Sequence, residues 1–230
     1  MTSTRLPGKV LLPVGGQTVL DHHADRLAWS GLPLYIATTT NATDDVLVQW
    51  AIQRGLPVYR GSEDDVLSRY YGCAVQHNLD VIVRVTSDCP LIDGHLIRQA
   101  VDAYVKDDND QAYLSNCLVR TYPRGFDFEI FSFAALREAQ EKAVTIPQRE
   151  HVTPYIHQNV SGRVELSHFT QAQDDHGYRI TLDTEDDFRL IRELIEAFGC
   201  AGKPAEEIIK ILREHPYLHQ INAHVEQKKS

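Results

Sequence analysis

The 230-residue chain lacks the features that would suit it to a bilayer or a nucleic acid. No apolar run approaches the roughly 20 residues that a membrane-spanning helix needs. Basic residues are few: 23 Lys and Arg stand against 32 Asp and Glu, a formal net charge of −9. Because such a field repels nucleic acids and anionic lipids, we expect neither as a partner, and any phosphate ligand needs a local basic pocket.

Cysteine is also scarce, and its spacing argues against disulfides and zinc knuckles. The four residues Cys73, Cys89, Cys117 and Cys200 form no C-x-x-C pair. This pattern is typical of reduced thiols in a cytosolic protein. The first residues lack the continuous apolar core of a signal peptide. We therefore expect the protein in the cytoplasm.

Several catalytic signatures are missing as well. The chain contains neither the G-x-x-x-x-G-K-[ST] phosphate loop nor a G-x-G-x-x-G dinucleotide fingerprint. No Ser-His-Asp or Cys-His arrangement is evident, which argues against a covalent nucleophile. A phosphate ligand must therefore be held by some other loop.

Hydrophobic periodicity predicts an α/β fold with three layers and a mainly parallel sheet. Residues 34–39 and 80–86 are apolar at successive positions, which is typical of strands buried on both faces. Helical patterns at 43–54, 64–78 and 95–105 alternate with them. Residues 127–131 alternate polar with apolar, so 122–170 is predicted to be a small antiparallel excursion. We interpret 1–230 as one domain, with 203–230 as a C-terminal helix and tail.

A loop rich in hydroxyl and basic groups opens the chain. Residues 3–9 read STRLPGK and place Ser3, Arg5, Gly8 and Lys9 around a Pro-Gly turn. Such a loop can direct N–H groups, a guanidinium and an ammonium onto a polyphosphate. The alternative is an exposed basic tail without a ligand.

Two aspartates follow short apolar segments farther along the chain. Asp88 comes just after the predicted strand at 80–86, where α/β sheets bind ligands. A carboxylate there can hold Mg²⁺ on nucleotide phosphates, or it can cap the turn before Pro90. Asp183 precedes a helix-capping pattern formed by Thr184 and Asp187, which makes it the better ligand candidate of that segment.

Taken in order, these stretches resemble the cytidylyltransferases that activate acidic sugars. The motifs are STRLPGK at 3–9, TSDCPLI at 86–92 and LDTEDD at 182–187. Further matching stretches are ATTTN at 37–41, RGSEDDVL at 60–67, YPRGFDFE at 122–129 and REHVTPY at 149–155. The resemblance is greatest to the spore-coat polysaccharide branch and implies a Rossmann-like nucleotidyltransferase sheet. It also implies an enzyme that transfers CMP from CTP to a sugar, releases pyrophosphate and serves surface polysaccharide biosynthesis.

The resemblance assigns roles to named residues. Arg5 and Lys9 would be catalytic through charge neutralisation, and Asp88 and Asp183 would hold Mg²⁺. The nucleotide would contact Ser3, Gly8, Thr38, Ser62, Asp65 and Arg84. The sugar would contact Tyr122, Asp127, Glu129, Arg149, His151 and Tyr155, with a buried structural histidine as the alternative for His151. CTP and a sugar would be the partners, and a homodimer through the excursion is expected.

The chain departs from the family pattern at its start. Relatives place a hydrophobic strand and a further basic residue before the phosphate loop, whereas only Met1 and Thr2 precede Ser3. We expect a misplaced start or a truncated form with impaired catalysis. Two other readings stay open: a glycosyltransferase that uses a nucleotide sugar, and a non-catalytic homologue that binds nucleotide or a partner.

Overall fold

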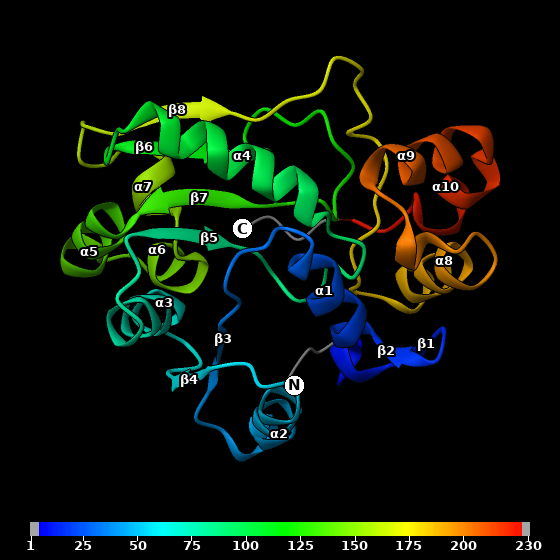
Figure 1. Cartoon of the computed structure of the whole chain (residues 1–230), viewed down its shortest axis with the longest axis horizontal. Coiled ribbons are helices and arrows are strands. Elements are labelled where there is room, and N and C mark those ends of the chain that lie inside the picture. The colour runs from blue at the N-terminus through cyan, green and yellow to red at the C-terminus, as the bar shows by residue number, and fades with distance from the viewer. Residues whose placement is uncertain (1–4, 227–230) are drawn as a thin grey trace.

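The computed structural model describes residues 5–226, and in it a layered α/β unit sits beside a cluster of C-terminal helices (Figure 1). The main sheet has four strands in the order β5 (Val81–Arg84), β7 (Glu129–Ser132), β6 (Ala112–Ser115) and β8 (Glu165–His168). β7 runs antiparallel to β5 and β6, whereas β8 is parallel to β6. Three of these four strands therefore point the same way.

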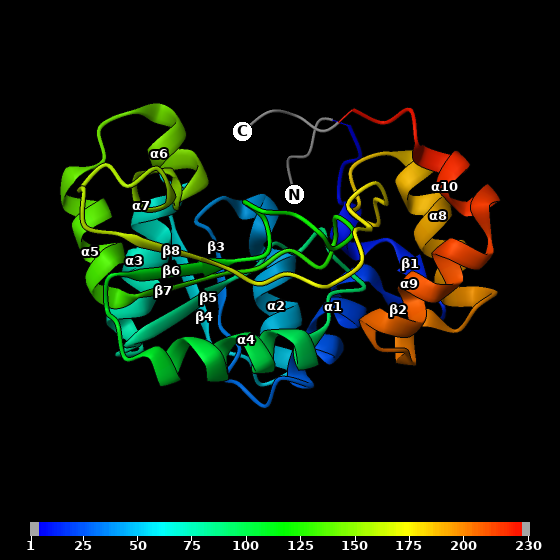
Figure 2. The same ribbon diagram turned by 90° about the horizontal axis from the view of Figure 1, so that it is seen from above.

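Side-chain alternation along these strands feeds two separate cores. Ile82, Tyr113 and Phe131 project to one face, where α3 (Val66–Gln76), α5 (Phe133–Lys142) and α7 (Pro154–His157) cover them. Leu114 and Ile130 project to the other face and pack against α4 (Gly94–Asp107). Because successive side chains of a strand point to opposite faces, four short strands serve both layers (Figure 2).

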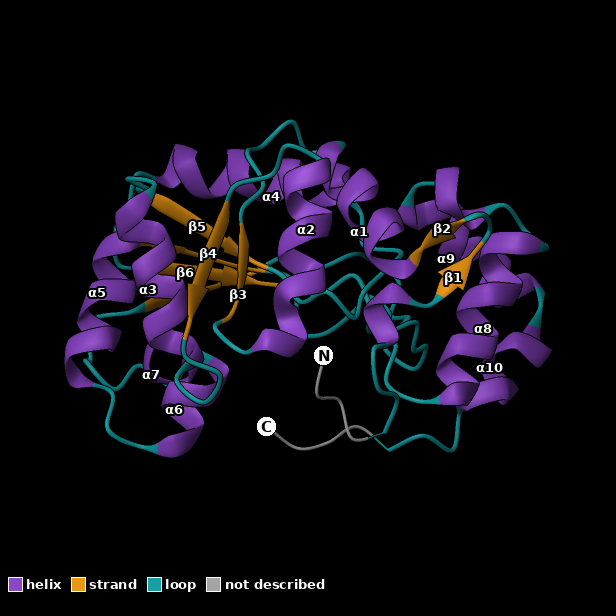
Figure 3. Cartoon of the chain, turned by 90° about the horizontal axis from the view of Figure 1, so that it is seen from below, coloured by secondary structure: helices purple, strands orange, loops and turns teal. Residues whose placement is uncertain are grey.

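A second, two-stranded sheet lies beside this unit. β3 (Ile36–Thr39) and β4 (Val58–Gly61) are parallel, with Ile36 opposite Val58. The 3₁₀ helix η2 (Ala42–Asp44) and helix α2 (Asp45–Gln53) connect them, and α3 leads on from β4 to β5 (Figure 3).

The C-terminal helices pack on the amino-terminal elements. Here α8 (Glu185–Glu196), the 3₁₀ helix η3 (Cys200–Gly202), α9 (Ala205–Glu214) and α10 (Pro216–Asn222) surround a third apolar core. The 3₁₀ helix η1 (Lys9–Leu11), the hairpin of β1 (Pro13–Val14) and β2 (Gln17–Thr18), and α1 (Val19–Ala28) complete this part.

One buried arginine joins the two ends of the chain. Arg26 of α1, 1% exposed, donates to the carbonyl oxygens of Ile92 at 2.6 Å, Cys200 at 3.1 Å, Ala201 at 3.0 Å and Lys203 at 2.8 Å. These bonds offset much of the cost of burying the guanidinium. They fix α1 against η3 and so hold the amino-terminal loop beside α8.

The α/β class, the strands at 34–39 and 80–86, and the antiparallel strand at 127–131 are confirmed. Other details differ. The tail expected after residue 215 contains α10, and the helix expected near 148–158 is two helices, α6 (Ile146–His151) and α7. Val152, with φ of 72°, separates them, and a positive φ in a β-branched residue cannot be read from helical periodicity. Within the described residues no helix is long and apolar enough to cross a membrane.

Candidate functional site

The ammonium of Lys9 lies between two carboxylates that are distant in sequence. The left-handed Gly8, with φ of 65°, turns the loop into η1 and directs Lys9 inward. Its Nζ donates to Asp183 Oδ1 at 2.8 Å and to the Leu182 carbonyl oxygen at 2.7 Å, and it lies 3.4 Å from Asp88 Oδ2. The structure thus brings together the three residues singled out as phosphate and metal ligands.

The main chain fixes the distance between the two acids. Asp88 follows β5, and its carbonyl oxygen accepts the N–H of Leu182 at 2.8 Å. Thr184 begins α8 with a capping box that includes Asp187, which leaves Asp183 just before the helix. The carboxylates are therefore positioned by backbone contacts, independently of a ligand.

Arginines surround Asp183 on its other side. Arg5 Nη2 is 3.2 Å and Arg179 Nη2 is 2.7 Å from Asp183 Oδ2. Burial opposes ionisation of Asp183, but the bond and charge of Lys9, followed by Arg179 and Arg5, outweigh it and lower the pKa of this carboxyl. Asp183 is therefore held in its ionised form.

Arg179 also holds a fully buried acid beneath the site. Its Nε donates to Asp187 Oδ1 at 3.0 Å, and the Asp187 side chain is 0% exposed. The Asp187 carboxylate accepts further bonds from Asn222 Nδ2 at 2.8 Å and from the backbone N–H of Asp183 at 2.9 Å. This network ties the Asp183 backbone to α8 and α10.

A second basic group lies next to the cradle. Arg120 donates to Asp127 at 2.5 Å and 3.0 Å, and the charge of Asp127 acts on Cys89, the neighbour of Asp88. Burial lowers the pKa of Arg124, and the charges of Arg120 and Arg179 lower it further. An anion beside Arg124 would relieve this repulsion.

The other residues predicted to bind nucleotide have partners within the protein. The buried Thr38 donates its hydroxyl to Asp44 Oδ2 at 2.7 Å. The exposed Ser62 accepts the N–H of Asp65 at 3.0 Å, and Asp65 Oδ1 accepts from Arg149 Nε at 3.0 Å. Ser3 lies outside the described residues. A nucleotide role for these side chains stays a prediction.

Arg84 and Glu129, predicted on nucleotide and on sugar, form an ion pair with each other across β5 and β7. Glu129 is buried and also accepts from the hydroxyls of Tyr113 at 2.5 Å and Thr153 at 2.6 Å. Burial would oppose a charge here, and three donors compensate it. The pair links the carboxyl end of β5 to α7.

Three predicted sugar contacts lie in or near apolar surroundings. Tyr122 is buried and stacks on Phe169 with ring centroids 6.0 Å apart. Tyr155 belongs to the core between the sheet and α5. His151 is half-buried at the end of α6. The structure does not gather these three around Lys9 by any described contact, and their sugar role stays a prediction.

The donor set fits a hard divalent cation. Among residues 5–226 no cluster of three or more His, Cys, Asp or Glu side chains forms a metal site. Mg²⁺, however, is commonly held by one or two carboxylates together with substrate phosphates. Asp88 and Asp183, both within reach of one ammonium, supply such a pair.

Two residues of the cradle were missed by sequence reasoning. Arg179 lies four residues before Asp183, and Arg120 lies seven before Asp127. The first spacing was visible, but residues 179–183 are extended, so a helical i,i+4 rule gave no reason to pair them.

Comparison with known proteins identifies similar chains. A family model described as cytidylyltransferase matches residues 1–229. An uncharacterized protein of Methanocaldococcus jannaschii is 36% identical over 98% of this chain and 92% of its own length. The spore coat polysaccharide biosynthesis protein SpsF of Bacillus subtilis is 33% identical over 94% of this chain and 92% of that protein.

Solved structures agree. A cytidylyltransferase from Leptospira borgpetersenii superposes with a TM-score of 0.91 at 32% identity and covers 100% of this chain and 95% of that one. A CMP:2-keto-3-deoxy-manno-octonic acid synthetase complexed with CTP gives a TM-score of 0.62 at 15% identity, covering 85% and 95%. The second likeness supports the fold alone.

Proposed function

Because the chain belongs to the cytidylyltransferase family and is thus a nucleotidyltransferase, we propose that it transfers CMP from CTP to an acidic sugar with release of pyrophosphate. The similarity to SpsF leads us to place this reaction in the biosynthesis of a surface polysaccharide. The arrangement that carries the proposal is the cradle of Arg5, Lys9, Asp88 and Asp183.

The cradle supplies charges of both signs at one point. Lys9 Nζ lies at the end of a flexible stem, 2.8 Å from Asp183 and 3.4 Å from Asp88. With CTP bound, this ammonium and the guanidinium of Arg5 would contact the phosphates and offset the charge that develops on the α-phosphate and pyrophosphate. Mg²⁺ held by Asp88 and Asp183 would add charge neutralisation of the same phosphates.

The reaction needs positioning more than a covalent group. A sugar oxygen attacks the α-phosphorus in line, the bond to the bridging oxygen breaks, and pyrophosphate leaves. The backbone bond from Leu182 to Asp88 keeps the two acids in place without ligand. Lys9 and Arg5 would therefore meet the triphosphate in a frame that is already formed.

Arg124 supports an acidic acceptor. Its guanidinium is partly buried close to two other arginines, so a carboxylate on the sugar would gain from its charge. Arg120 and Asp127 form a neighbouring pair that can position Arg124. A homodimer also remains a prediction for light scattering to test.

The proposal is tested by pyrophosphate release with CTP and Mg²⁺ over a panel of neutral and acidic sugars. We expect release with CTP in preference to UTP, and only with acidic acceptors. Lys9→Met should lower kcat/KM by about 100-fold or more, since it removes a transition-state charge. Lys210→Met, an exposed ion-paired lysine on α9, is the matched control and should leave the rate unchanged.

Asp88→Asn and Asp183→Asn address the metal. Each should raise the Mg²⁺ concentration needed for half-maximal rate, whereas the exposed Asp102→Asn on α4 should not. Nucleotide binding without any pyrophosphate release, on a panel that includes acidic sugars, would favour a non-catalytic homologue. Turnover of a nucleotide sugar without CTP would favour a glycosyltransferase.

A further inference from the structure

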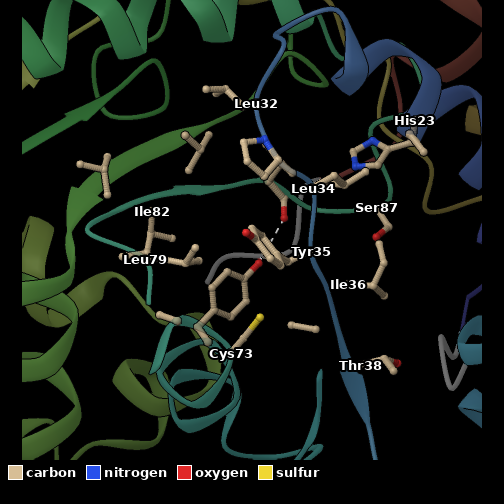
Figure 4. Close-up of a pocket in the computed structure, with 18 of the residues that line it drawn as sticks. His23, Leu32, Leu34, Tyr35, Ile36, Thr38, Cys73, Leu79, Ile82 and Ser87 are labelled. Atoms are coloured by element: carbon tan, nitrogen blue, oxygen red, sulfur yellow. Dashed lines mark hydrogen bonds between the residues drawn. The ribbon is translucent and has the colours of Figure 1, made fainter. Parts of the chain in front are cut away.

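A large apolar cavity separates β3 from β5 (Figure 4). Its volume is about 580 Å³. One wall carries Leu34 and Ile36 of the β3 segment, and the opposite wall carries Val81 and Val83 of β5. The cavity thus lies between the two sheets, where a continuous sheet would contain one more strand. We call this cavity the slot.

Helices from both layers close the slot. Leu20 and Ala24 of α1 line it from one direction, and Tyr70 and Cys73 of α3 line it from the other. An occupant therefore meets apolar side chains on both faces. Such surroundings are typical of a central strand in a parallel sheet, which is buried on both sides.

The β3 edge that faces the slot has an open backbone. The N–H of Ile36 donates to Pro57 and that of Thr40 to Gly61, so the even-numbered residues bond toward β4. Because consecutive N–H groups in a strand point to opposite edges, that of Ala37 points away from β4, toward the slot. Within the described chain β3 pairs with β4 alone.

β5 presents an open edge for the same reason. The N–H of Phe133 donates to the Asp80 carbonyl oxygen at 2.8 Å, which sets the alternation along β5 and β7. The bonded positions are then Ile82 and Arg84, so Val81 and Val83 direct their N–H and C=O groups to the other edge. Unpaired backbone groups that face an apolar cavity are costly, and a strand would satisfy both edges together.

We propose that the slot accepts an extended apolar segment, about five residues long, that joins β3 and β5 into one sheet and is attached on the amino-terminal side of the loop that holds Arg5 and Lys9. The attachment follows from position. Lys9 reaches Asp88, just beyond the carboxyl end of β5. A segment parallel to β5 leaves the slot at that end, directly beside the loop. Four linking residues reach at most about 14 Å, enough for such a connection.

The test compares the chain with two forms extended before Met1. One carries Val-Ile-Val-Ile-Val and the control carries Gly-Ser-Gly-Ser-Gly. The apolar extension should raise the calorimetric Tm by roughly 5 °C or more, and the control should not, because only the first buries apolar area and pairs both edges. Equal Tm values for the two extended forms would overturn the proposal.

Cys73 gives a local readout. It lines the slot, whereas the buried Cys200 lies in the core around α8. The apolar extension should slow alkylation of Cys73 at least about fivefold beyond its effect on Cys200, which reports global opening. An equal slowing of both thiols would mean general stabilisation without occupation of the slot, and would refute the assignment.

Ala37→Pro tests the backbone pairing. It removes the N–H directed at the slot and keeps the bonds that Ile36 and Thr40 make toward β4. The variant should reduce the Tm gain from the apolar extension by at least about 2 °C, measured against the same variant without extension. The free Val-Ile-Val-Ile-Val peptide at equal concentration should have little effect, because tethering supplies a high effective concentration. A free peptide as effective as the extension would overturn the attachment.

Discussion

Replacing Arg179 by leucine should strongly destabilise the protein, because it leaves a buried carboxylate without its cation. Asp187 has no exposed side-chain surface, and Arg179 Nε donates to it at 3.0 Å. Breaking a buried ion pair by removing one partner costs about 3–5 kcal/mol. For a chain of this length the Tm should fall by roughly 6–20 °C.

The loss should depend on pH with a defined sign. Burial opposes ionisation of Asp187, but Arg179 and then Asn222 outweigh it, so the folded-state pKa is lowered in the native protein. The native pair therefore adds stability above the unfolded pKa of about 3.9, and this is lost as pH falls. In Arg179→Leu burial dominates and raises the pKa of Asp187, so its penalty appears as pH rises. The difference between the two proteins should be larger at pH 7 than at pH 4.

Urea unfolding at both pH values measures the effect, with Asp187→Asn and the double variant completing a cycle. Asp187→Asn should recover part of the loss in the Arg179→Leu background, since no buried charge remains. Arg98→Leu removes an exposed arginine paired with Asp102 on α4 and should cost no more than about 1 kcal/mol. A cost below about 1 kcal/mol for Arg179→Leu, or strict additivity in the cycle, would refute the reasoning.

Two further predictions concern positions that hold the site and the β3 end. Asp44 is buried and accepts from both Thr38 and Thr39; although burial opposes its charge, these bonds lower its pKa to about 2, so Asp44→Ala should cost about 2 kcal/mol at pH 7 and progressively less as pH falls from 4 to 2, as acid unfolding curves will record. Gly125 has φ of 114°, and a Cβ there would lie 2.9 Å from the Ile180 backbone, so Gly125→Ala should lower both Tm and the rate of pyrophosphate release. Gly177→Ala, where an added Cβ meets nothing within 4 Å, is its control, and equal behaviour of the two would contradict the close-approach argument.

Periodicity and strand ends predicted the parts of the fold that depend on local sequence. The run at 80–86 became β5, and Asp88 followed its carboxyl end as expected. Strand order was beyond such reasoning. β7 lies between β5 and β6 and reverses the local direction, and this placement depends on long-range pairing that periodicity does not encode.

Side-chain partnerships were equally hidden. Arg84 and Glu129 were assigned to different substrates, yet they face each other in the register of β5 and β7. Tyr155 follows a histidine-rich stretch but lies in the core, because the positive φ of Val152 turns α7 back toward the sheet. Polar residue types indicated the neighbourhood of the site, whereas register and turns decided which group contacts which.

The cradle separates a rigid element from an adaptable one. Backbone bonds link residues 88 and 182 and residues 124 and 180, so the acids and Arg124 keep their spacing whatever the ligand. Lys9 instead reaches them with a flexible side chain, and its ammonium can move from carboxylate to phosphate at little conformational cost. A fixed pair of acids and a mobile cation suit a ligand that carries its own metal. The same division explains why Gly125, which permits the close approach to Ile180, should affect turnover from outside the cradle.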